Sequence, residues 1–335
     1  MNERVWLQAD TSLVNKFLAG LAAIFVFLSV AACSRNETDT SSETEAKSQP
    51  GDPSETSHHS QRGVTAIWES EKLPARIEHL ALSSSTSGQA FALAITVDGQ
   101  AHLIDLDGAI AAIGQLPLAA DITNGFATQV EDQFLIAFPT INWSDDDGAI
   151  PKLTLASPIA KAIVQTDLDT NGTQISKLAS SSVSSSTVCV ISNDKTPASA
   201  ELDFLNESAT LILSDQQDIC PETHDAPLAM TIGDNDIALK IGADDDLVAI
   251  NGDDPLIITL TDGLSVSAPQ SIDAIAALEG RVSVDYPNGL IVLAGINDRN
   301  EPRLTFLSAR DVAHAMGLTV TEEQFTPPTL PDTLD

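Results

Sequence analysis

Aromatic and basic residues are both scarce in this chain of 335 residues. Phe, Trp and Tyr together make up 4%, so the core must be built from Leu, Ile, Val and Ala. Only 16 residues are Lys or Arg, against 48 Asp or Glu, which gives a net charge of −32. Nucleic-acid binding proteins approach phosphates with clustered Lys and Arg, so this composition argues against that function. The 43% hydrophobic content excludes a wholly disordered chain.

An apolar run near the N-terminus is too short to be an ordinary membrane span. Residues 17–32 form an uncharged run of 16 residues, whereas a transmembrane helix needs ~20. Basic Arg4 and Lys16 precede it, as in a secretory signal peptide. The run ends in Val30-Ala-Ala-Cys33, which resembles the bacterial lipobox, and we expect cleavage before Cys33 and lipidation of that cysteine. The alternative is an uncleaved signal anchor with an incidental cysteine.

The sequence after the lipobox predicts a flexible tether to the cell envelope. Residues 34–63 contain no Val, Ile, Leu or Phe and are rich in Ser, Thr and Glu, so they have nothing to bury. The pair His58 and His59 lacks further metal ligands and is interpreted as linker. Ser34, rather than Asp, follows the cysteine and favours the outer membrane. We therefore divide the chain into a signal peptide (1–32), a lipidated, disordered linker (33–63) and a folded domain (64–335).

Two more cysteines lie in the folded domain. In an exported protein, Cys189 and Cys220 are expected to form a disulfide. It would close a loop of 32 residues and stabilise the fold by about 3–4 kcal/mol. The alternative is two separate buried thiols. A metal site is less favoured, because Cys220 and His224 offer two ligands only.

From residue 64 onward the sequence alternates short apolar segments with turn formers. Segments such as 91–95, 134–138 and 290–293 are separated by Asp-Gly and Asn-Gly pairs, the strongest short-range hairpin signals. Only residues 309–318 show the periodicity of an amphipathic helix. Many short strands predict a β-sandwich or a β-propeller. Six blades of about 40–45 residues would fit the length of the domain.

Several segments, in order, resemble the β-propeller phytases, which are calcium-dependent, six-bladed enzymes that remove phosphate from inositol hexakisphosphate. The segments are Thr65-Ala-Ile-Trp68, His102-Leu-Ile-Asp-Leu-Asp-Gly108, Asp121-Ile-Thr-Asn-Gly-Phe126, Asp167 to Leu178, Tyr286 to Gly295, Leu304 to Val312 and Met316-Gly-Leu318. The resemblance decides between the two architectures and implies an all-β, six-bladed β-propeller with a short C-terminal helix. It also implies Ca²⁺ ions, held by carboxylates, that activate water and clamp phosphate.

The positions that carry chemistry in that family are mostly replaced here. Gly63 and Val64 stand where the family has two aspartates, and Leu228 stands where it has a glutamate. Thr123 or Asn124 stands where it has a phosphate-binding arginine. The resemblance therefore implies that hydrolysis of phytate phosphomonoesters is weak or lost.

A few acidic residues remain as candidate Ca²⁺ ligands. They are Asp244, Asp245 and Glu279. The acidic clusters 145–147, 244–246 and 253–254 are otherwise interpreted as solvated loops of a very acidic protein. Residues 167–172 begin like an EF-hand loop, but Leu178 replaces its last glutamate, so a hairpin turn is expected. His79, His102, His224 and His314 are interpreted as surface or turn residues.

Two functional hypotheses follow from the sequence. The first is a phytase-like phosphoric monoester hydrolase with residual or no activity. The second is a non-catalytic propeller of the cell envelope that binds a protein or an inositol phosphate, or that assists a complete phytase. In both, the chain is a monomer anchored by lipid to the outer membrane.

The lipoprotein hypothesis makes a direct prediction. Replacing Cys33 by Ser removes the acceptor of the lipid, so the chain should lose its lipid anchor and should leave the membrane fraction. Fractionation of cells that express either form, followed by blotting, measures this. Equal processing and equal membrane retention of the two forms would contradict it.

Overall fold

The computed structural model describes residues 63–84, 89–106, 109–116, 120–130, 133–144, 148–170, 172–178, 187–192, 197–205, 208–214 and 227–321. The expected signal peptide, Cys33 and almost all of the expected linker lie outside these residues, as do Cys220 and His224. The described chain consists of strands β1 to β23 and one short helix, α2 (Ala309–Ala315). The expected all-β class and the helix near the C-terminus are therefore confirmed.

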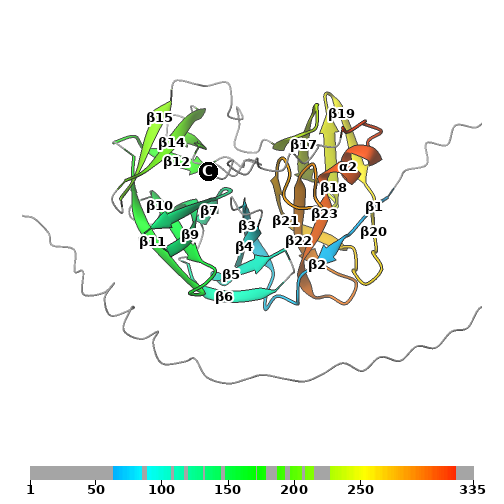
Figure 1. Ribbon diagram of the computed structural model, residues 1–335, viewed down its shortest axis with the longest axis horizontal. Helices are drawn as coiled ribbons and strands as arrows, with labels where there is room; N and C mark the ends of the chain where they lie inside the picture. The colour runs from blue at the N-terminus through cyan, green and yellow to red at the C-terminus, as the bar shows by residue number, and fades with distance from the viewer. Residues whose placement is uncertain are drawn as a thin grey trace, which may run out of the picture. The chain divides into compact units, whose positions relative to one another are not determined.

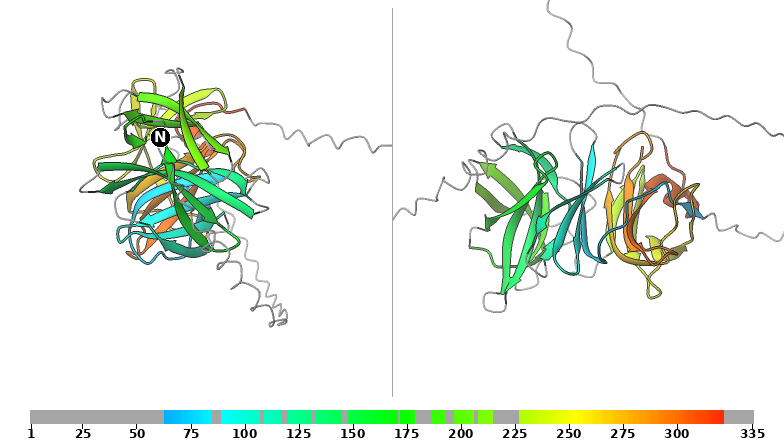
Figure 2. Two further views of the ribbon diagram at one scale, coloured as in Figure 1. Left: turned by 90° about the vertical axis from the view of Figure 1, so that its left-hand side faces the viewer. Right: turned by 90° about the horizontal axis from the view of Figure 1, so that it is seen from below.

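Three of the sheets contain four antiparallel strands each. In the first, each strand pairs with the next along the chain: β3 (Ile77–Ser84), β4 (Ala90–Thr96), β5 (Gln100–Asp105) and β6 (Ile110–Gln115). Figure 2 shows these strands, blue to cyan, as one twisted sheet. The second has the same order: β16 (Leu228–Ile232), β17 (Asn235–Ile241), β18 (Leu247–Asn251) and β19 (Asp254–Ile258).

The third four-stranded sheet joins the two ends of the described chain. Its order is β2 (Trp68–Glu69), β23 (Pro302–Ser308), β22 (Leu290–Ile296) and β21 (Ser271–Leu278). Trp68 is the register partner of Phe306, and Figure 1 shows β2 beside the C-terminal strands. Just before it, β1 (Val64–Thr65) pairs in parallel with β20 (Leu260–Thr261). The segment that follows the linker is thus held by the last third of the chain.

The remaining strands form a nine-stranded sheet. They are β7 (Ala120–Ile122), β8 (Phe126–Val130), β9 (Gln133–Ser144), β10 (Gly148–Ser157), β11 (Ala162–Asp169), β12 (Ile175–Leu178), β13 (Thr187–Ser192), β14 (Pro197–Leu205) and β15 (Ser208–Ser214). Here β8 to β11 and β12 to β15 are two antiparallel groups of four, joined by a parallel pair between β11 and β15. Twenty of the 23 described strands thus fall into five groups of four, and β1, β7 and β20 lie outside these groups.

Strand β22 is buried on both faces. Leu290, Val292 and Ala294 pack in a core with β3, β4 and β5. Ile291 and Leu293 pack in a core with β16, β17 and β18. Successive side chains of a strand point to opposite faces, so this continuous apolar run serves two cores at once. The first and second sheets therefore cover opposite faces of the third.

Asn124 connects the segment between β7 and β8 to two other sheets. Its Oδ1 accepts a hydrogen bond from Leu82 N of β3 at 2.7 Å, and its Nδ2 donates to Ala277 O of β21 at 2.6 Å. Gly125 N donates to Leu82 O at 2.9 Å. A Cβ at Gly125 would lie 2.5 Å from Ala137 O, so the close approach requires glycine. This buried amide therefore fixes three segments that are far apart in the sequence.

We predict that Asn124→Ala destabilises the fold by about 2–4 kcal/mol, because it leaves Leu82 N–H and Ala277 C=O buried without their partner. Urea unfolding followed by circular dichroism measures the difference. As a control, Asn251→Ala removes one exposed hydrogen bond, to Asp236 O, and should change the free energy of unfolding by less than about 0.5 kcal/mol. Similar losses for both variants would contradict the role assigned to Asn124.

Candidate functional site

The three candidate Ca²⁺ ligands lie at different places in the fold. Asp244 and Asp245 are exposed in the turn between β17 and β18. The backbone O of Asp245 accepts a hydrogen bond from Ile272 N, at the start of β21, at 3.0 Å. Glu279 follows the other end of β21, and its Oε1 accepts a hydrogen bond from Thr231 N at 2.9 Å.

The length of β21 separates the two parts of this ligand set. From Ile272 to Glu279 the strand rises by about 23 Å, at ~3.3 Å per residue. Ca²⁺ ligands lie at about 2.3–2.6 Å from the ion, so one ion cannot contact both ends. In the described part of the chain, no three His, Cys, Asp or Glu side chains gather in a way that could hold a metal. These residues do not fit the Ca²⁺ site that the family resemblance implies.

The replaced family positions take part in packing. Val64 is buried in the pairing of β1 with β20. A Cβ at Gly63 would lie 2.5 Å from Thr261 Cγ2, so a larger residue there would have to displace that side chain. Leu228 is buried in the core between the second and third sheets. Asn124 is engaged by the backbone of β3 and β21. At these positions the protein uses apolar or structural contacts.

The segment that resembles the start of an EF-hand loop is a strand followed by a turn. Asp167 lies in β11, where it forms an ion pair with Lys152 of β10. Thr173 N donates to Thr170 O at 3.0 Å, and Gly172 has a φ of 80°. The turn is confirmed, but the expected hairpin is wrong, because β12 pairs with β13 and not with β11.

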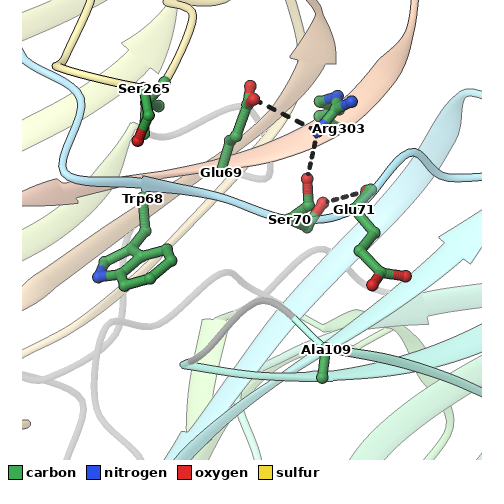
Figure 3. A pocket seen from close by; sticks show the side chains of 8 residues that line it. Trp68, Glu69, Ser70, Glu71, Ala109, Ser265 and Arg303 are labelled. Carbon is green, nitrogen blue, oxygen red and sulfur yellow. Dashed lines mark hydrogen bonds and ion pairs between the residues drawn. The ribbon is translucent and has the colours of Figure 1, made fainter. Parts of the chain in front are cut away.

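A cavity of about 330 Å³ opens beside the short strand β2 (Figure 3). We call it the Trp68 pocket. Its lining residues are Trp68, Glu69, Ser70, Glu71, Ala109, Ser265, Val266 and Arg303. They come from β2 and its continuation, the turn before β6, the loop after β20, and β23. The pairing of β2 with β23 brings these segments together.

Arg303 is held by acceptors on several sides. Its Nη2 lies 2.8 Å from Glu301 Oε2 and its Nη1 lies 3.3 Å from Glu69 Oε1. Nη1 also donates to Ser70 O at 2.8 Å. The hydrogen bonds from Arg303 lower the pKa of Glu301. The guanidinium is therefore already engaged by two carboxylates and a carbonyl of its own protein.

The pocket has two chemically different sides. Figure 3 shows Glu69 directed toward Arg303, while the Trp68 indole and the Glu71 carboxylate lie on the other side of the chain. Trp68 is 45% exposed although it is a large apolar residue. Glu69 Oε2 is buried and has no hydrogen-bond partner. The pocket therefore offers an aromatic surface and carboxylate acceptors.

No local pattern in the sequence predicts this pocket. Trp68 was expected as part of a blade motif, and no role was expected for Arg303. The two residues are separated by most of the domain, and no local spacing connects them. The one sequence feature that could have indicated a binding site is Trp68 itself. The chain contains only three tryptophans, and Trp68 directly precedes the carboxylate of Glu69.

His102 and His79 are less exposed than the surface or turn positions expected for them. His102 lies in β5 and is 4% exposed, with neither ring nitrogen bonded to a partner. Burial lowers its pKa, and Asp98 opposes this shift. The surface or turn position expected for His102 is wrong, because its ring faces the same side of β5 as buried Ile104. His314, in contrast, is exposed in α2, as expected.

His79 belongs to a group of polar residues from β3, β7 and β12. Burial lowers the pKa of His79 and raises that of Asp121, while Lys177 of β12 lowers both. His79 Nε2, Asp121 Oδ2 and Thr123 Oγ1 are buried without hydrogen-bond partners. The three atoms are therefore not hydrogen-bonded to one another.

Cys189 is disulfide-bonded and buried in β13. The expected partner, Cys220, lies outside the described residues, so the pairing stays a prediction.

Comparisons with known proteins give no family for this chain. No protein-family model and no curated protein matches it. Among solved structures, a triple arginine-to-alanine mutant of AofleA from Arthrobotrys oligospora is 7% identical, with a TM-score of 0.33, over 72% of this chain and 87% of that one. At this TM-score the likeness supports no inference about fold or function. Among the described helices, none is long and apolar enough to cross a membrane.

We predict that His102 makes the stability depend on pH. The pKa of His102 is about 6.5 in the unfolded chain and is lower in the folded protein. As the pH falls below 6.5, the unfolded state therefore binds a proton more readily than the folded state does, and the free energy of unfolding falls. His102→Leu removes this loss. Between pH 7.5 and pH 5.0, the wild type should therefore lose free energy of unfolding relative to the variant, as measured by urea unfolding.

His102→Gln serves as the control, because it keeps a buried polar group that does not titrate. It should show the pH dependence of the Leu variant. The same pH dependence in the wild type and both variants would contradict the prediction.

Proposed function

We propose that this chain is a lipid-anchored binding module of the bacterial outer membrane, built on a phytase-like β-propeller. The Trp68 pocket carries the proposal. It is a cavity that offers an aromatic surface and carboxylate oxygens, at a place where distant parts of the chain meet. Pockets with an apolar surface and a few polar groups are the usual sites of ligand binding.

The arrangement of the sheets supports the propeller. The first, second and third sheets each contain four antiparallel strands. The third sheet shares one apolar core with the first and another with the second, as neighbouring blades of a propeller do. The third sheet takes one strand from the start of the domain and three from its end. Such mixed sheets join the ends of a chain that folds as an array of similar units. The lipid on Cys33 remains a proposal from the sequence.

Effective hydrolysis of phytate is not part of this proposal. Phytate carries many negative charges, and a protein with a net charge of −32 repels it at long range. In the pocket, Arg303 is paired with Glu69 and Glu301 and does not offer its charge to phosphate. The candidate Ca²⁺ ligands Asp244, Asp245 and Glu279 do not surround one point. Among the described residues that line the pocket, Arg303 is the one cation, and its carboxylate partners already engage it.

The full-length chain in neutral detergent should release phosphate from phytate at least about a hundredfold more slowly than an active β-propeller phytase, in millimolar Ca²⁺, since one lost transition-state contact of this kind costs ~10²-fold. Both proteins are assayed side by side, and circular dichroism verifies that each is folded. A rate within about tenfold of the active enzyme, or ~1.4 kcal/mol in barrier, would contradict the proposed function.

A further inference from the structure

The exposed side of the Trp68 pocket combines an indole with a carboxylate. Figure 3 shows the Trp68 ring and the Glu71 carboxylate on the same side of the chain, with Ala109 below Glu71 in the view. Both side chains are exposed. The face of an indole is the strongest aromatic partner for a cation within about 6 Å of the ring.

The pocket lining holds carboxylate acceptors, and its guanidinium is already engaged. Glu69 Oε2 is buried without a partner. Arg303, the cation in the lining, donates to Glu301 and to Ser70 O and is paired with Glu69. The exposed carboxylate of Glu71 therefore favours a ligand that brings hydrogen-bond donors or positive charge.

The charge of the pocket favours a positive ligand. Glu69, Glu71 and Arg303 line it. Outside the lining, Glu301 contacts Arg303 and Lys72 contacts Glu301, so acids outnumber bases by three to two among these residues. The net charge of −32 adds an attractive field for cations. A neutral sugar would gain from the ring and the acceptors but not from this field, and an anion would be repelled.

We propose that the Trp68 pocket binds an organic cation, an ammonium or guanidinium group on an alkyl chain, between the indole of Trp68 and the carboxylate of Glu71. The alkyl part lies against the indole and Ala109, and the charged end meets the carboxylate. This inference rests on the proposed function as a binding module and names its ligand class. The cation comes from a lysine or arginine side chain of a basic protein or from a free polyamine.

The test uses the full-length chain in neutral detergent and a tetralysine peptide. The control peptide carries four Nε-acetyl-lysines, which keep the length and remove the charge. Calorimetry measures affinity, and the indole N–H resonance of Trp68 reports the site. Tetralysine should bind and shift the Trp68 resonance, whereas the acetylated peptide should not. Binding should weaken as salt is raised, because the charges are near the surface.

Variants separate the pocket from the general negative charge. Trp68→Leu should weaken tetralysine binding by about fivefold, the size of an exposed cation–π contact. Glu71→Gln should weaken it and reduce its salt dependence. Trp143→Leu is the matched control, since Trp143 is 44% exposed on β9, away from the pocket lining, and should change affinity by less than twofold.

Three results would overturn the proposal. Equal binding of the two peptides would show that charge is not recognised. Unchanged affinity in both pocket variants would assign the binding to the diffuse surface charge. A Trp68 shift with methyl glucoside and none with tetralysine would assign the pocket to neutral sugars.

The source of the cation is decided by spermidine. If spermidine binds Trp68 as tightly as tetralysine, the cation is a free polyamine; if only tetralysine binds, it is a side chain of a basic protein. Either result supports the recognition of an organic cation. Phosphate release from phytate would contradict the proposed function while leaving these binding results intact, so the two failures are distinguishable.

Discussion

The pairing of β2 with β23 is the constraint on which the rest of the structure depends. It brings Trp68 opposite Phe306. Backbone and side-chain hydrogen bonds also join Ser70 to Arg303 and Leu304. Closing a long loop costs only slightly more entropy than closing a short one. A few hydrogen bonds and the buried strand β23 therefore suffice to hold the two ends of the described chain together. The same pairing creates the Trp68 pocket, and site and fold therefore have one origin.

Strands, turns and the helix could be predicted because their signals are local. The apolar run of β22 and the Asp-Gly turn at Gly99, which has a φ of 80°, are examples. The parallel pairing of β11 with β15 could not be predicted, because no local sequence pattern favours this pairing over two separate sheets. The burial of His102 was missed because alternation in β5 does not reveal that both of its faces are covered. The pair of Glu69 and Arg303 depends on the closure of the whole domain.

The positions where the phytase resemblance leads us to expect ligands carry structural contacts in this chain. Leu228 extends a core and Asn124 satisfies two backbone groups, so each residue contributes stability where a ligand or an arginine is expected. Arg303 is engaged by carboxylates in the same way. The net negative charge of the protein attracts cations and therefore favours them as ligands.

Hydrogen exchange of the full-length chain, with tetralysine or its acetylated form added, tests the central claim most directly. The claim is that the closure between β2 and β23 forms a site for organic cations. Tetralysine should slow exchange in peptides that cover residues 64–73 and 302–308, and leave those of β10 unchanged. Protection spread evenly over the domain, or equal protection by the acetylated peptide, would contradict the account.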